Sequence, residues 1–183
     1  MDRTRQPNLD IVRAEYTRWL AKYPWQWMLT LTFPGPLYPQ QLTAAANGAQ
    51  QNRTKFVHPQ HARKLFGVFV HWINHQLYGR GYYKHPGTGI YWVLAQEYQK
   101  NGQIHYHALM AADDDLNLVL SRKKAESKWQ SLAGFAVIKP VTNRMTTVTD
   151  YVGKYVYKEG DIELSDTMAC WQAQQLSGDL GSD

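Results

Sequence analysis

The stretch EYQKNGQIHYHAL, residues 97–109, has the pattern of a β-hairpin that carries metal-binding side chains. His105 and His107 are two residues apart, and side chains two residues apart on a strand lie on the same face of a sheet. Glu97 is the only Asp or Glu between residues 16 and 112. We therefore expect both imidazoles, with one further donor from the preceding strand, to bind one divalent cation.

The turn between the two strands decides which residue is that further donor. A two-residue Asn101-Gly102 loop places Gln96 opposite His107 and turns Glu97 away. A three-residue loop ending at Gly102, with a left-handed glycine and a bulge, places Glu97 opposite His105. A one-residue slip inverts every side chain of a strand, so the two arrangements exclude each other. We favour Glu97, because a carboxylate binds a hard divalent cation better than a neutral amide does.

Length and charge indicate one basic domain, residues 1–183, with an acidic C-terminal segment at 159–183. The formal net charge is +5, yet residues 16–96 contain eight Lys or Arg and no acid, whereas six acids and no base follow Lys158. Clustered positive charge favours a polyanionic partner such as nucleic acid. The single Cys170 excludes an intrachain disulfide. No apolar run reaches transmembrane length and the N-terminus lacks a signal-peptide core, so we expect a cytoplasmic location without a membrane partner.

Hydrophobic periodicity predicts helices that alternate with strands along the chain. Trp27, Leu29, Leu31 and Phe33 define one face of the first strand, and Pro34 ends it. Helices are expected at 9–22, 59–77, 113–132, 151–158 and about 168–175, strands at 25–33, 90–98, 103–110 and 135–139, and loops at 34–58 and 79–89. With one adjacent hairpin among the strands, this order predicts an α+β fold, a central antiparallel sheet with flanking helices.

The segment YVGKYVYK, residues 151–158, supplies candidate nucleophiles. On a helix Tyr151, Lys154, Tyr155 and Lys158 share one face, whereas Tyr157 turns away. A phenol with a pKa near 10 is a poor nucleophile in water, so it needs a cationic neighbour or a metal-polarised phosphate. The two lysines can supply that positive charge.

The order of these motifs resembles the HUH endonuclease superfamily, and more narrowly the rolling-circle replication initiator (Rep) proteins with their RRM-like palm. The resemblance covers about residues 27–158 and rests on MLTLTF, IHYHAL and YVGK. The position of Glu97 ahead of His105 matches several viral Rep proteins. The tyrosine pair resembles the two-tyrosine initiators of small single-stranded DNA phages, the gene A type. Tyr106 is bulkier than the residue usual between the histidines, and conjugative relaxases, with the motif order permuted, match less well.

The resemblance implies a metal-dependent endonuclease that nicks and rejoins single-stranded origin DNA to start rolling-circle replication. It implies that Glu97, His105 and His107 bind Mg²⁺ or Mn²⁺. It also implies that Tyr151 nicks the strand and keeps a 5′-phosphotyrosine bond, that Tyr155 cleaves the regenerated origin, and that Lys154 positions the reacting groups. Full initiators often carry a helicase domain, and no GxxxxGK[ST] phosphate loop occurs here, so a host or viral replication helicase is an expected partner.

The expected DNA contacts lie in two basic segments, 34–64 and 79–88, where aromatic residues that can stack on unpaired bases interleave with cations. The candidates are Arg53, Lys55, Arg80, Tyr82, Tyr83 and Lys84. Taken singly, each is also compatible with a solvated basic face. The same pattern allows an HUH transposase or relaxase-like nickase, a non-catalytic RRM-like nucleic-acid-binding domain, and a metal-dependent phosphohydrolase that uses water in place of tyrosine.

Overall fold

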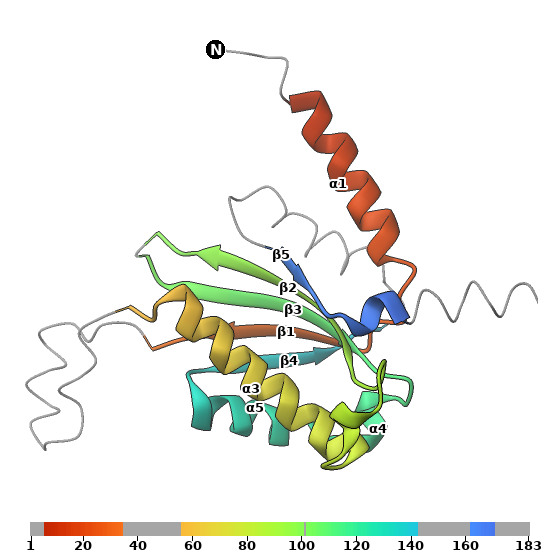
Figure 1. Cartoon of the computed structure of the whole chain (residues 1–183). Helices are drawn as coiled ribbons and strands as arrows, with labels where there is room; N and C mark the ends of the chain where they lie inside the picture. The colour runs from red at the N-terminus through yellow and green to blue at the C-terminus, as the bar shows by residue number, and fades with distance from the viewer. Residues whose placement is uncertain (1–5, 35–55, 101, 143–161, 171–183) are drawn as a thin grey trace, which may run out of the picture.

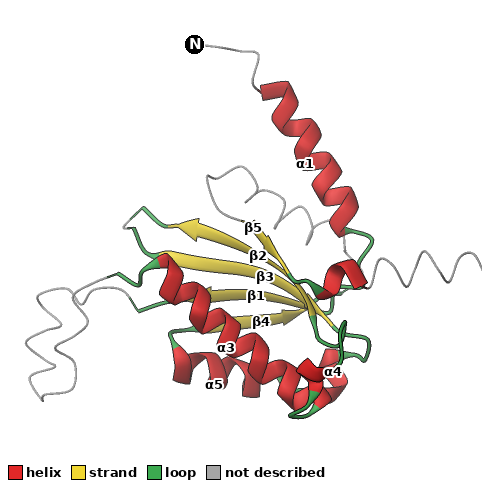
Figure 2. Cartoon of the chain, viewed as in Figure 1, coloured by secondary structure: helices red, strands yellow, loops and turns green. Residues whose placement is uncertain are grey.

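The structure, a computed structural model, describes residues 6–34, 56–100, 102–142 and 162–170. The described residues form one open antiparallel sheet of five strands with helices packed against it, an α+β fold as predicted (Figures 1 and 2). The strand order is β4-β1-β3-β2-β5. The strands are β1 (Trp27–Thr32), β2 (Tyr91–Tyr98), β3 (Ile104–Ala111), β4 (Ala136–Pro140) and β5 (Ile162–Leu164). The hairpin of β2 and β3 therefore lies in the interior of the sheet.

Two helices cover one face of this sheet, α3 (Pro59–Tyr78) and α5 (Arg122–Leu132) (Figure 1). The apolar face predicted for the first strand is confirmed, since Trp27, Leu29, Leu31 and Phe33 are all buried in the core beneath these helices. Phe66 and Phe69 of α3 and Trp129 of α5 fill the same core, with edge-to-face aromatic contacts such as Phe33 to Trp129 at 5.3 Å between ring centroids. Edge-to-face packing is a favoured geometry for buried aromatic pairs.

A second, smaller core covers half of the opposite face. Leu20, at the end of α1 (Gln6–Leu20), and the following Tyr23 and Trp25 pack on Val93 of β2 and Leu109 of β3. The rest of α1 extends away from the sheet (Figure 1). These contacts lie toward the end of β3 farthest from the hairpin turn, so this core leaves the turn end of that face for other contacts.

The structure corrects two of the predicted elements. The helix expected from 113 to 132 is two helices, α4 (Leu116–Val119) and α5, because Leu120 and Ser121 have extended backbones that place Leu120 in the core. The segment 159–183, read as an acidic tail with a helix, includes strand β5, which pairs with Val93 to Ala95 of β2. Residues 167–170 are helical, at the start of the helix expected near 168.

Other predictions fall outside the described residues or agree with the structure. The helix expected at 151–158 and most of the loop at 34–58 lie outside. Within the loop at 79–89 there is a short 3₁₀ helix, η1 (Tyr82–Lys84). Among the described residues, no helix combines the length and the apolar character needed to cross a membrane.

Candidate active site

The turn between β2 and β3 is the three-residue turn that the sequence favoured. The Gln99 N–H donates to the Gln103 carbonyl at 2.9 Å, and the Gly102 N–H donates to the Gln99 carbonyl at 2.8 Å. Gly102 has φ 82°, a left-handed backbone that glycine adopts without steric cost. This register pairs Glu97 with His105 and Gln96 with Tyr106. Glu97, and not Gln96, therefore shares the face of the histidines.

Glu97 and His107 are in direct contact on that face. The Nε2 atom of His107 lies 3.1 Å from Oε2 of Glu97. The His107 side chain is 5% exposed and that of Glu97 is 21% exposed, so the pair is largely shielded from water. A shielded carboxylate keeps more of its electrostatic effect on a bound cation or proton than an exposed one.

Two polar side chains that the sequence had not identified as part of the site hold the histidines from behind. Thr30 of β1 pairs with His107, and its Oγ1 lies 3.5 Å from Nδ1 of that ring. Gln99 places its amide nitrogen 3.2 Å from Nδ1 of His105. A hydroxyl and an amide can each face either imidazole tautomer, so both partners can orient a ring whose Nε2 is a ligand. Residue parity along the first strand was the signal that would have identified Thr30.

Burial lowers the pKa of His105 below its ordinary value, and the nearby carboxylate of Glu97 opposes this shift by a smaller amount. A lowered pKa keeps the imidazole neutral near pH 7, with one nitrogen lone pair available. Metal binding by histidine requires that neutral form. The environment of His105 therefore suits a ligand better than it suits a cationic phosphate contact.

The donor set fits a hard divalent cation, although the three side chains are not gathered around one point. Among the described residues, no three His, Cys, Asp or Glu side chains form a ready-made metal cluster. The 3.1 Å between His107 Nε2 and Glu97 Oε2 is nevertheless close to the spacing of about 3.0 Å between adjacent ligands of an octahedral ion with bonds of about 2.1 Å. One carboxylate and two neutral imidazoles suit Mn²⁺ or Mg²⁺, with water completing the coordination.

Tyr106, the bulky residue between the histidines, belongs to the opposite face. It is buried beneath α3, with its ring centroid 5.1 Å from that of Phe33 and 5.9 Å from that of Phe66. Alternation along β3 thus separates a core-filling aromatic from the two histidines that flank it. The departure from the usual residue type at this position changes core packing and leaves the histidine face unaltered.

The other predicted site residues lie elsewhere. Tyr151, Lys154 and Tyr155, with Arg53 and Lys55, lie outside the described residues. The remaining predicted DNA contacts, Arg80, Tyr82, Tyr83 and Lys84, lie at and around η1, just before the start of β2. Glu97 is near the other end of β2, about 20 Å from Tyr91 at some 3.3 Å per residue. These four residues and the histidines are therefore not neighbours.

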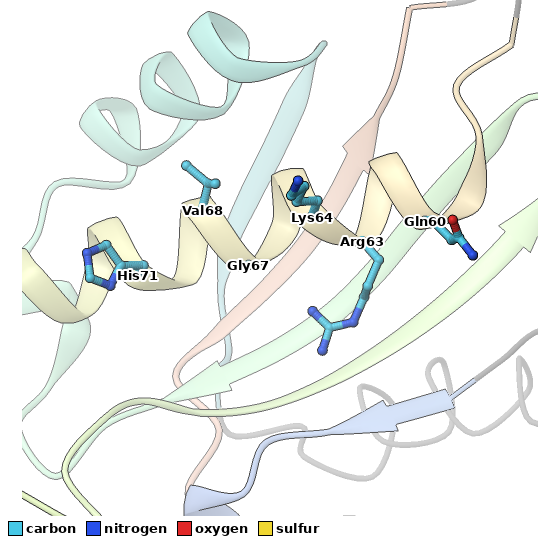
Figure 3. A pocket seen from close by; sticks show the side chains of 6 residues that line it. All are labelled: Gln60, Arg63, Lys64, Gly67, Val68 and His71. Atoms are coloured by element: carbon cyan, nitrogen blue, oxygen red, sulfur yellow. The ribbon is translucent and has the colours of Figure 1, made fainter. Parts of the chain in front are cut away.

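A shallow hollow lies along the outer side of α3, on the helix-covered side of the sheet (Figure 3). It is open over Gly67, whose missing side chain has nothing within 4 Å of the Cβ position. Arg63 points from this helix toward the sheet edge, where it forms an ion pair with Glu163 of β5. The other lining residues are Gln60, Lys64, Val68 and His71. Since α3 and the histidines are on opposite faces, the hollow is separate from the candidate active site.

Comparison with known protein families gives one match, which includes all the elements just described from β1 to β4. Residues 26–160 match the sequence model of a family of replication-associated proteins, the ORF2 type. The matched region contains Thr30, Glu97, His105 and His107, together with the tyrosine segment at 151–158. Searches of curated proteins and of solved structures gave no significant match.

Proposed function

We propose that this chain, which belongs to the family of replication-associated proteins of the ORF2 type, is an endonuclease that nicks and rejoins single-stranded DNA to initiate rolling-circle replication. The observation that carries the proposal is the sheet register. It brings Glu97, His105 and His107 onto one face of a replication-associated protein, although the carboxylate comes from a different strand than the imidazoles.

In this proposal Glu97, His105 and His107 hold Mg²⁺ or Mn²⁺. When bound, such an ion polarises a phosphate and stabilises charge on its oxygens. Glu97 supplies the negative charge that retains a dication in a basic protein. Thr30 and Gln99 keep the His107 and His105 rings directed at the phosphate by holding their Nδ1 atoms.

The nucleophile in this proposal is Tyr151, with Tyr155 for the second cleavage and Lys154 to stabilise the phenolate. The Tyr151 oxygen attacks the phosphorus, the bond from phosphorus to the 3′ oxygen breaks, and that oxygen takes up a proton. One phosphodiester is exchanged for one phosphotyrosine diester, so a returning 3′-hydroxyl can reseal the strand without ATP. Duplex unwinding is assigned to a separate replication helicase, since no phosphate loop occurs in the sequence.

The test uses a library of single-stranded oligonucleotides with a random central segment, labelled at either end and incubated with Mn²⁺. A denaturing gel should show protein-linked DNA that retains the 3′ label and releases the 5′ label. EDTA, His107→Ala and the Tyr151→Phe, Tyr155→Phe double variant should each abolish the linked species. Linked DNA that persists in the double variant, or cleavage with release of both labels, would sink the tyrosine mechanism, and the second result would favour a water-using phosphohydrolase. Metal-independent binding without any cleavage would instead favour a non-catalytic nucleic-acid-binding domain.

A further inference from the structure

Phe135 is an exposed aromatic residue on the same face of the sheet as the candidate active site. It precedes β4, whose first residue Ala136 points into the helix-covered core, so alternation places the Phe135 side chain on the opposite face. Its side chain is solvent-accessible, with 63% of the residue exposed. An exposed phenylalanine leaves apolar surface in water, and a large apolar group held there commonly marks a contact with a partner.

The backbone of Phe135 is fixed to the edge of β1 by three hydrogen bonds to Thr32. The Phe135 carbonyl accepts from the Thr32 N–H at 2.8 Å and from the Thr32 hydroxyl at 3.0 Å, and the Phe135 N–H donates to the same hydroxyl at 2.9 Å. Thr32 in turn pairs with His105, and His105 pairs with Glu97. Phe135, Thr32, His105 and Glu97 therefore form one row across four strands.

The spacing of this row suits a nucleic acid strand. Adjacent strands are about 4.8 Å apart, so Phe135 lies about 10 Å across the sheet from His105. Successive phosphates of an extended single strand are separated by somewhat less than this, so a base near the reacting phosphate can reach the ring. Among the described strand residues on this face Glu97 is the only acid, because Glu163 of β5 lies beside Leu94 on the helix-covered side. Lys139, exposed and two residues along β4 from Val137, adds positive charge.

We propose that Phe135 is a positioning residue that stacks on one unpaired base of the DNA strand held at the histidine face. The proposal rests on the proposed nuclease function and goes beyond it by assigning a base-binding position on β1 and β4. The ring offers a flat apolar surface on a fixed backbone, and such a surface stacks on any base without reading its identity. It therefore fixes the register of the strand, while the polar groups of the site act on the phosphate.

The test measures the affinity of the full chain for two fluorescent probes by anisotropy, in buffer without a divalent cation. One probe is an oligothymidylate of about 20 nucleotides, and the other is a base-free spacer strand with the same number of phosphates. Phe135→Ala and Phe135→Leu should weaken oligothymidylate binding by roughly 5- to 150-fold, the range for one stacked base. Phe135→Tyr should restore it, and all variants should bind the base-free strand as the wild type does.

Tyr98→Ala is the matched control, because Tyr98 is 51% exposed at the same end of the sheet but pairs with Ile104 on the helix-covered face. It should leave both affinities unchanged, and the urea midpoint of Phe135→Ala should match that of the wild type. Equal oligothymidylate affinity for wild type and Phe135→Ala would overturn the stacking role and favour a protein partner at this ring. Equal losses on both probes, or no oligothymidylate binding by the wild type, would overturn it as well. Protein-linked DNA formation is scored separately, so a failed stacking role is distinguishable from a failed nuclease.

Discussion

Replacing Gly134 with alanine should destabilise the protein, because the backbone of β1 occupies the space that a Cβ atom would need. A Cβ at this position would lie 2.6 Å from the Thr32 carbonyl oxygen, 3.0 Å from the Thr32 carbonyl carbon and 3.2 Å from the Phe33 Cα. All three are backbone atoms at the end of a strand paired on both sides, so none can swing aside. Gly134 has no positive φ, so the expected cost comes from contact and not from backbone strain.

The magnitude follows from what must move. Overpacking of this kind costs about 1–3 kcal/mol. The Thr32 carbonyl also accepts the Trp129 indole N–H at 3.1 Å, so its displacement adds about 1 kcal/mol for a weakened hydrogen bond. The lower backbone entropy of alanine in the unfolded chain offsets about 0.4–1 kcal/mol. We expect the free energy of unfolding to fall by about 1–3 kcal/mol, a decrease in Tm of roughly 3–10 °C for a chain of this size.

Gly67→Ala is the matched control, the same chemical change inside helix α3. Nothing lies within 4 Å of its Cβ position, and alanine is a better helix former than glycine, so this variant should gain about 0.5–1 kcal/mol. Urea denaturation followed by fluorescence of the seven tryptophans measures both variants. If Gly134→Ala is as stable as the wild type, or if both substitutions shift stability in the same direction, the loop before β4 does not sit against β1 as described.

Three further predictions test the turn, the carboxylate and an ionisable core group. Gly102→Ala should cost about 1–2 kcal/mol, because a left-handed backbone strains alanine, whereas Gly102→Asn should lose less in the same urea titration. Glu97→Gln should weaken Mn²⁺ binding at least tenfold by calorimetry with little change in Tm, and unchanged affinity would remove Glu97 from the proposed ligand set. Burial, aided by the nearby Asp113, raises the pKa of Tyr78 to about 12 from an ordinary value of 10, so the folded state favours the protonated phenol. That stabilisation is complete below pH 10 and is lost as the pH rises toward 12, so Tyr78→Phe should lose about 2 kcal/mol less than the wild type over this range.

The hairpin was predictable from sequence because its information is local. A left-handed glycine at position 102 and the two-residue period of strands leave two registers, and ligand chemistry separates them. The same period predicted the buried face of β1 from its four apolar residues. Thr30 was missed because its role depends on which strand becomes the neighbour of β3, and strand order is a property of the whole sheet.

The two corrected elements failed for related physical reasons. Strand β5 is three residues long, too short for a periodic pattern, and its pairing with β2 is a long-range contact. The helix predicted from 113 to 132 breaks where Leu120 turns into the core in an extended conformation. Ser121, a residue type favoured at helix starts, was the local signal for a second helix beginning at Arg122. The position of Arg80 to Lys84 at the far end of β2 was likewise set by the path of α3 and not by local composition.

The burial gradient along β3 explains why the histidines occupy these two positions on their face. Leu109 and Ala111 are sealed beneath the Leu20, Tyr23 and Trp25 cluster, His107 is 4% exposed at its border, and His105 is partly exposed beyond it. A ligand at the border is shielded enough for its contact with Glu97 to act strongly, while a ligand beyond it is reachable by a phosphate. The N-terminal aromatic cluster therefore has a functional consequence. It closes one half of the face, and a bound strand must cross the turn half, along the row from Glu97 to Phe135.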